Sequence, residues 1–176
     1  MMAGTVGRSM KVMVAIDDSE GSFHALQWTL DNLSNVIRAT PIDDGMVTLV
    51  HVQEPFQHRI FPVGSAASTA VYLTSTAVEN IRKSQQENSA RILSRALQIC
   101  EAKMVKAETL ILDGEPREMI CQAAEQMNVD LLVVGSRGFG MIKRTLLGSV
   151  SDYCAHHAKC PILIVKPPRE QQQKSK

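Results

Sequence analysis

Residues 130–138 read Asp130-Leu-Leu-Val-Val-Gly-Ser-Arg-Gly138, an aliphatic run that ends in a glycine-rich turn. Short runs rich in Val, Ile and Leu are typical of strands buried on both faces of a sheet. Similar runs occur at residues 11–16, 46–52, 107–112 and 161–165. We therefore expect five strands, the fourth formed by residues 130–134.

Segments with helical periodicity separate these strands, because apolar residues recur at spacings of three and four. The expected buried faces are Phe23, Leu26, Leu30 and Leu33; then Ala90, Leu93, Leu97, Cys100 and Met104; then Ile120, Ala123, Ala124 and Met127. A further helix is expected from about Gly148 to His157. Alternating strands and helices predict an α/β fold with a parallel sheet and right-handed crossovers.

The length of 176 residues fits one domain with a substantial core. We expect this domain to span residues 11–167, after a flexible N-terminus at 1–10. Residues 55–76 show no period and predict an irregular loop. The tail at 168–176 is polar and predicted to be disordered.

The composition narrows the classes of partner. A formal net charge of +1 gives no electrostatic case for binding nucleic acid. No apolar run approaches a membrane span or a signal peptide, so a cytoplasmic protein is expected, with the nucleus as the alternative. The four cysteines form no C-x-x-C pair and are interpreted as buried or half-buried thiols. We predict no metal site, because Cys154 should lie on a helix and Cys160 just before a strand.

The glycines that follow the fourth strand point to an anion site. Gly135 and Gly138 permit a positive φ and a close approach of a ligand. Gly148 and Ser149 stand where a helix should begin, and its free N–H groups favour an anion. Ser149 and Ser151 could cap this helix or donate hydroxyl groups to phosphate oxygens. The stretch from Gly135 to Ser151 is therefore predicted to hold phosphates, although a plain glycine-rich turn stays open as the alternative.

Two other strand ends extend this interpretation. Asp17 directly follows the first strand, where a carboxylate can accept hydrogen bonds from ribose hydroxyls. Asp18 or Ser19 could instead only cap the helix that follows. Val52 ends the second strand and could offer backbone groups to a base, whereas His51 is expected to be structural.

Together these motifs resemble the ATP-binding branch of the universal stress protein family. The sequence of residues 14–20 resembles the plant single-domain members of that branch. Gly135, Gly138, Gly148 and Ser149 match the family's spaced glycine motif without a gap. Family-like stretches also occur at 14–20, 114–116 and 160–165. The resemblance covers residues 11–167.

The resemblance implies a three-layer, doubly wound α/β/α fold with strand order 3-2-1-4-5, of the adenine nucleotide alpha hydrolase-like kind. It implies ATP, ADP or AMP as the ligand, and it allows a Mg²⁺ ion bound to the phosphates of the nucleotide. It further implies a homodimer formed through residues 161–165. The implied positions are Ala15, Ile16 and Val52 at the adenine, Asp17 and Gly135 at the ribose, and Arg137, Gly138, Gly148, Ser149, Val150 and Ser151 at the phosphates.

Binding a nucleotide does not require hydrolysing it. Hydrolysis needs a positioned water and a base, and no obvious base lies near the predicted phosphate site. We therefore favour a nucleotide-binding regulatory module of the stress response over an enzyme, and predict no catalytic residue. A slow ATPase and a nucleotide-independent interaction or chaperone-like protein stay open as alternatives.

Overall fold

A single parallel sheet organises the domain. The computed structural model describes residues 9–38, 45–55, 75–136 and 147–167. Its elements are β1 (Val12–Ala15), α1 (Glu20–Ile37), β2 (Met46–Gln53), α2 (Ser75–Ala102), β3 (Lys106–Asp113), α3 (Pro116–Gln126), β4 (Leu131–Gly135), α4 (Ser149–His157) and β5 (Ile162–Val165). The five strands are all parallel and lie in the order β3-β2-β1-β4-β5, which confirms the predicted fold class and strand order.

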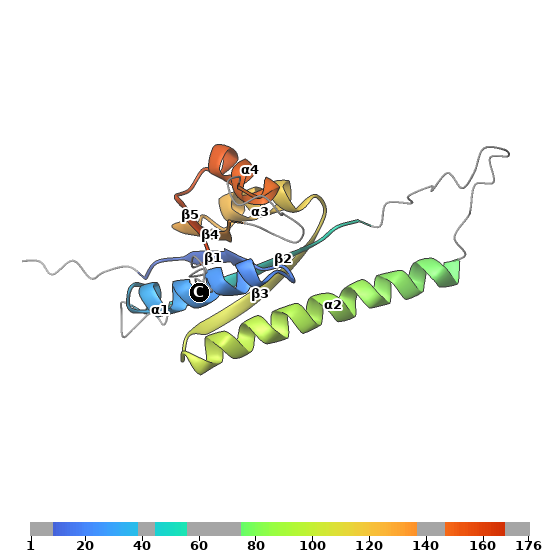
Figure 1. The fold of residues 1–176 in the computed structure, drawn as a ribbon, viewed down its shortest axis with the longest axis horizontal. Helices are drawn as coiled ribbons and strands as arrows, with labels where there is room; N and C mark the ends of the chain where they lie inside the picture. Colours follow the sequence, from blue (N-terminus) through green and yellow to red (C-terminus); the bar gives the residue numbers. More distant parts are fainter. Residues whose placement is uncertain (1–8, 39–44, 56–74, 137–146, 168–176) are drawn as a thin grey trace, which may run out of the picture.

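Helices cover both faces of the sheet (Figure 1). α1 and α2 pack on one face, where Val14, Leu26 and Leu49 are fully buried. α3 and α4 pack on the other face, with Met13, Leu132 and Cys154 equally buried. The chain thus winds to one side of the sheet after β1 and to the other side after β4. Between these two strands lies the switch point at which open α/β sheets bind ligands.

The edge strands depart from the predicted burial, and β3 shows this most clearly. It lies at the edge of the sheet, and its residues alternate between half-buried and exposed, with 47% of Ile111 accessible. An edge strand has one neighbour and is covered less completely, so the expectation that all five strands are buried on both faces was wrong for β3 and also for β5, whose first three residues are half-buried.

The predicted buried face of α2 was also partly wrong. Leu93 and Cys100 are buried as expected, together with Ser89, Ile92 and Ala96. In contrast, Ala90 is exposed, Leu97 is 38% exposed, and Met104 lies beyond the helix at 81% exposure. The first turns of α2 also extend past the sheet (Figure 1), so the sheet gives them no apolar partner. The buried faces predicted for α1 and α3 are confirmed for Phe23, Leu26, Leu30, Ile120, Ala123 and Ala124.

Local sequence signals set the starts of the helices at the carboxyl end of the sheet. Ser19 caps α1 by accepting a hydrogen bond from the Ser22 amide at 3.2 Å. Pro116 opens α3, where its missing N–H would have had no helical partner. Gly114 precedes it with a φ of 147°, a conformation that only glycine adopts readily. No helix of the described part of the chain is long and apolar enough to cross a membrane.

Candidate functional site

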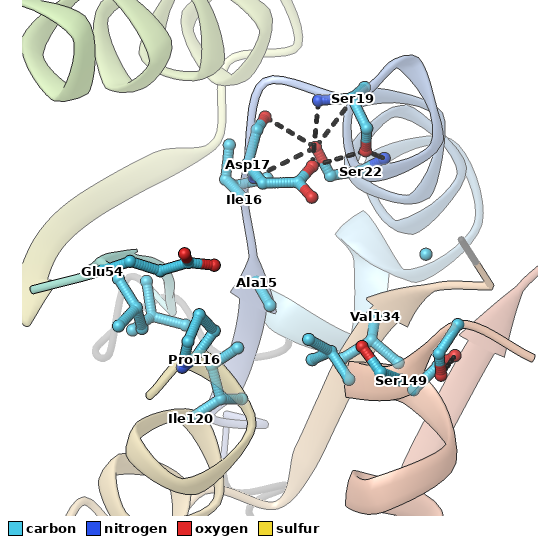
Figure 2. A pocket seen from close by; sticks show the side chains of 16 residues that line it. Ala15, Ile16, Asp17, Ser19, Ser22, Glu54, Pro116, Ile120, Val134 and Ser149 are labelled. Atoms are coloured by element: carbon cyan, nitrogen blue, oxygen red, sulfur yellow. Dashed lines mark hydrogen bonds between the residues drawn. The ribbon is translucent and has the colours of Figure 1, made fainter. Parts of the chain in front are cut away.

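A cavity of about 360 Å³ opens at the carboxyl ends of β1, β2 and β4 (Figure 2). Glu54 and Pro116 lie on one side of it and Ser149 on the other, with Asp17 beside Ser19 and Ser22. The cavity therefore occupies the switch point of the sheet, where two chain segments separate to opposite faces.

Most of the predicted site residues meet at this cavity. Those that line it are Ala15, Ile16, Asp17, Val52, Gly135, Gly148, Ser149, Val150 and Ser151. The remaining two, Arg137 and Gly138, lie outside the described residues. Residues as far apart along the chain as Ala15 and Ser151 thus contribute to one cavity, because parallel strands bring their carboxyl ends to the same edge.

The cavity has further lining residues that the sequence prediction did not include. They are Ser19, Ser22, Val50, Glu54, Pro116, Ile120 and Val134. Glu54 directly follows β2, and Pro116 opens α3 three residues after the end of β3, so the rule that located Asp17 at a strand exit could have located them too. Ile120 and Val134 carry no such signal, because apolar residues on α3 and β4 are indistinguishable in sequence from ordinary core.

One half of the cavity is apolar. Ala15 and Val52 project from the strand ends, and Pro116 and Ile120 face them from α3. The carboxylate of Glu54 lies at the margin of this group (Figure 2). An apolar slot with a polar group at its rim suits a flat aromatic ring that carries hydrogen-bonding atoms on its edge.

Val52 pairs with Leu112 of β3, but on its β1 side its backbone faces this slot and has no strand partner. Backbone groups of successive residues in a parallel strand point to alternate sides. The Val50 carbonyl accepts from the Ile16 amide at 2.8 Å, and the Gln53 carbonyl accepts from the Gly114 amide on the other side. Val52 therefore points to the β1 side, as Val50 does. Because β1 ends at Ala15, both the N–H and the C=O of Val52 face the cavity.

His51 helps to keep that edge open. Its Nδ1 lies 2.8 Å from the carbonyl oxygen of Ile16, and only 7% of the residue is exposed. If the β1–β2 pairing continued, the Val52 amide would donate to the Ile16 carbonyl. No such hydrogen bond forms between these two described residues. The structural role predicted for His51 is confirmed: it satisfies the last carbonyl of the β1 exit in place of Val52.

The β1–α1 turn holds Asp17 at the rim. Oδ1 of Asp17 accepts from the amide and the hydroxyl of Ser19. The Ser22 hydroxyl donates toward the carbonyl oxygens of Asp17 and Ser19, at 2.9 and 3.0 Å. The helix cap belongs to Ser19, so the capping alternative for Asp18 was wrong. One oxygen of Asp17 orders the turn, and its other oxygen can accept from a ligand.

The opposite end of the cavity is the N-terminus of α4. Gly148 is its N-cap, and no side chain caps the helix among the described residues. The amides of Ser149, Val150 and Ser151 precede the first intrahelical hydrogen bond, which the Asp152 amide makes to Gly148 at 2.9 Å. These amides and the helix dipole together favour an anion.

Two details of this end differ from the sequence prediction. The hydroxyl of Ser151 is directed at the carbonyls of Ser136 and Gly148, at 3.2 and 3.0 Å, so it does not cap α4. Its role is to hold the start of α4 against the exit of β4. Ser149 likewise makes no cap.

Gly135 does not have the positive φ that the sequence predicted, and a close packing contact requires a glycine at this position. Among the described glycines only Gly114 has a positive φ, so Gly135 is not needed for a left-handed turn. A Cβ at this position would lie 2.8 Å from the carbonyl oxygen of Gly21 and 3.2 Å from the amide of Ser22. The glycine lets β4 approach the first turn of α1, and this close packing sets the floor of the cavity.

Comparisons with known proteins agree with this architecture. A model of the universal stress protein family matches residues 9–166. The universal stress protein A-like protein of Arabidopsis thaliana is 30% identical over 165 residues, which cover 89% of each chain. Universal stress protein YxiE of Bacillus subtilis is 31% identical over 156 residues, which cover 89% of this chain and 98% of that protein.

Among solved structures, a universal stress protein family protein from Arabidopsis thaliana with AMP bound is 26% identical. The match covers 94% of this chain and 97% of that one, with a TM-score of 0.61. The glycine spacing, the strand order and these matches lead to one conclusion: the chain belongs to the universal stress protein family.

Proposed function

We propose that the cavity binds an adenine nucleotide and that the protein acts as a nucleotide-binding module of the stress response. The observation that carries the proposal is the pairing of two features at opposite ends of one cavity. The open backbone edge of Val52 faces an apolar slot, and the uncapped N-terminus of α4 stands across from it. A ring at one end and phosphate at the other fit a nucleotide.

The base preference follows from the backbone of Val52. Adenine carries an acceptor, N1, beside a donor, the N6 amino group. The N–H and C=O of one residue on the same strand edge offer the complementary donor and acceptor. Ala15 and Ile16 would lie against the ring, since both line the apolar slot. The AMP bound in the Arabidopsis relative supports the same class of ligand.

The phosphates would lie at Gly148, Ser149, Val150 and Ser151, with Gly135 near the ribose. The last three residues of this α4 stretch offer free backbone amides, and the Gly148 amide donates to the Ser136 carbonyl at 2.7 Å. Arg137 and Gly138 extend this proposed set on the basis of the sequence motif. These residues could hold AMP, ADP or ATP, and with ATP a Mg²⁺ ion bound to its phosphates.

We favour a nucleotide-binding module over a slow ATPase, and a single-turnover assay with Mg-ATP separates the two. A rate above that of buffer would favour the enzyme.

The ribose contact gives the first prediction. Asp17→Asn should weaken the binding of AMP by about 1–3 kcal/mol, the usual value of a hydrogen bond to a charged group. Asparagine keeps an oxygen for Ser19, so the turn should persist while the charge is lost. Calorimetric titration measures the affinity, and circular dichroism checks the fold.

Asp18→Asn is the matched control, because Asp18 pairs with Arg91 at 3.2 Å and does not line the cavity. It should bind AMP as the unaltered protein does. Equal affinity of the unaltered protein for AMP and its 2′-deoxy analogue would contradict the role of Asp17.

The proposal includes a cytoplasmic homodimer formed by the exposed edge of β5. Within the described part of the chain this strand pairs with β4 only, and Ile162, Leu163 and Ile164 are half-buried. The carbonyls of Pro161 and Val165 accept from β4, so the backbone groups of Ile162 and Ile164 point outward. An open apolar edge of this kind favours pairing with a second copy.

The dimer gives the second prediction. Ile164→Pro removes one outward N–H without removing a hydrogen bond to β4, and should convert the dimer to a monomer in sedimentation velocity runs. Ile111→Pro is the matched control at the opposite edge, since the Ile111 backbone points away from β2. A monomeric unaltered protein, or loss of the dimer in both variants alike, would refute pairing through β5.

A further inference from the structure

Two cysteine side chains touch across the helices that cover the α3–α4 face of the sheet. The thiol of Cys121 on α3 donates a hydrogen bond to Sγ of Cys154 on α4, with 3.4 Å between the sulfur atoms. The residues are 33 positions apart along the chain. The nucleotide site uses neither thiol, and both cysteines are reduced in this structure.

The two thiols differ in access. Cys154 has no exposed surface, whereas Cys121 is half-buried. Burial raises the pKa of both thiols, and the thiol of Cys154 partly offsets this rise for Cys121. Cys121 is therefore the sulfur that an oxidant in solution reaches first and that ionises more readily.

We propose that Cys121 and Cys154 are a redox site at which a hydroperoxide forms a reversible disulfide between α3 and α4. The Cys121 thiolate attacks one oxygen of the hydroperoxide and the O–O bond breaks. Cys121 becomes a sulfenic acid, and the other oxygen takes a proton from solvent and leaves as water or, from an organic hydroperoxide, as an alcohol. The sulfur of Cys154 then attacks the sulfenic sulfur. The S–S bond forms, the S–O bond breaks, and the Cys154 proton leaves with the hydroxyl group as water. A dithiol reductant reverses the change by exchange.

The geometry requires only a small movement. A disulfide brings its sulfur atoms to about 2 Å, from the 3.4 Å at which they now stand. The remaining cysteines are placed differently. Cys160 is half-buried just before β5 and packs against the same apolar cluster as Cys121 and Cys154, but among the described cysteines the sulfur–sulfur hydrogen bond joins only those two. Cys100 is buried among α2 residues on the other face of the sheet.

The bond would act on the walls of the cavity. Cys121 follows Ile120, and Cys154 lies one helical turn beyond Ser151; both neighbours line the cavity. Joining the two helices covalently would fix their spacing, which non-covalent contacts such as that of Arg117 with the Tyr153 ring otherwise maintain. Whatever ligand the cavity takes, the bond itself does not depend on it, so its test is separate from that of nucleotide binding.

The test is a peptide map of the full-length protein after treatment with hydrogen peroxide and alkylation of the remaining thiols. Trypsin cleaves after Arg137 and Lys159, which places Cys121, Cys154 and Cys160 on separate peptides. We expect a Cys121–Cys154 linked peptide that dithiothreitol removes, with Cys100 and Cys160 still alkylated. The melting temperature should rise by about 5–10 °C, since the bond closes a loop of the unfolded chain.

Variants separate this pair from the other cysteines. Cys121→Ser and Cys154→Ser should each abolish the peroxide-dependent rise in melting temperature, whereas Cys160→Ser and Cys100→Ser should keep it. Because the map is made on the unaltered protein, it decides the question even where a variant fails to fold. A link between another pair, a link between chains, or oxidation of Cys121 to sulfinic acid without a link would overturn the proposal.

Discussion

Gly148→Val should abolish measurable nucleotide binding while the protein stays folded. Gly148 is the N-cap of α4, and its backbone lies at φ −67° and ψ 157°, an extended conformation that valine adopts readily. The valine side chain would occupy the space in front of the amides of Ser149 and Val150. Losing two or more charged hydrogen bonds weakens binding by roughly 100-fold or more.

The measurement is a calorimetric titration with AMP and with ATP, alongside thermal unfolding. The variant should unfold cooperatively, with a loss of about 1 kcal/mol because valine is a poor N-cap. Gly148→Ala adds a single methyl group and should give an intermediate affinity. Unchanged affinity in a folded Gly148→Val protein would mean that the α4 N-terminus does not hold the phosphates.

Gly135→Val should instead damage the fold. The added Cβ would stand 2.8 Å from a carbonyl oxygen and 2.9 Å from a carbonyl carbon of Gly21. Both are backbone atoms, so relief requires α1 to move away from β4, and these elements pack closely. Inserting atoms into such a contact costs about 1–3 kcal/mol, and more where backbone must shift.

Chemical denaturation measures this loss as a lower midpoint at an unchanged slope. The two glycines belong to the same motif, which makes each the control for the other. Gly148→Val should lose ligand and keep most of its stability, and Gly135→Val should lose stability even without ligand. A fully stable Gly135→Val protein would show that the β4–α1 contact is looser than described here.

The fold could be predicted from particular segments because their patterns are unambiguous. The aliphatic runs at β1, β2 and β4 are buried in the middle of the sheet, and their short length and their content of Val, Ile and Leu favour strands. The strand order itself came from the family resemblance, since strand patterns do not state which strands are neighbours. Burial at β3 could not be predicted, because an edge strand and a central strand can share the same aliphatic residues.

The buried face of α2 was obscure for a related reason. Its residues Ile92, Leu93 and Ala96 face the core, whereas Leu97 does not. The sequence does not show that the neighbouring Arg95 contacts α1. In the structure its guanidinium stacks over the ring of Phe23 at 3.9 Å and pairs with Glu20 at 3.0 Å. Such contacts between distant helices depend on tertiary packing, which a single helical period does not encode.

At the site, the strand-exit rule located Asp17, Val52 and the α4 N-terminus, because topology alone brings those positions together. It could not give the orientation of backbone groups. That Val52 presents both its N–H and its C=O follows only from the end of β1 at Ala15 and from the contact of His51 with the Ile16 carbonyl. The contact between Cys121 and Cys154 was invisible for the same reason, since it depends on how α3 lies on α4.

Mass spectrometry of the small molecules released from the purified, acid-denatured protein tests the central claim most directly. The cavity joins an adenine-complementary backbone edge to an anion site, so we expect AMP, ADP or ATP near one equivalent per chain. Gly148→Val, purified in parallel, should release none. If the unaltered protein releases no adenine nucleotide and also fails to bind added AMP or ATP in calorimetry, the proposed nucleotide site is wrong.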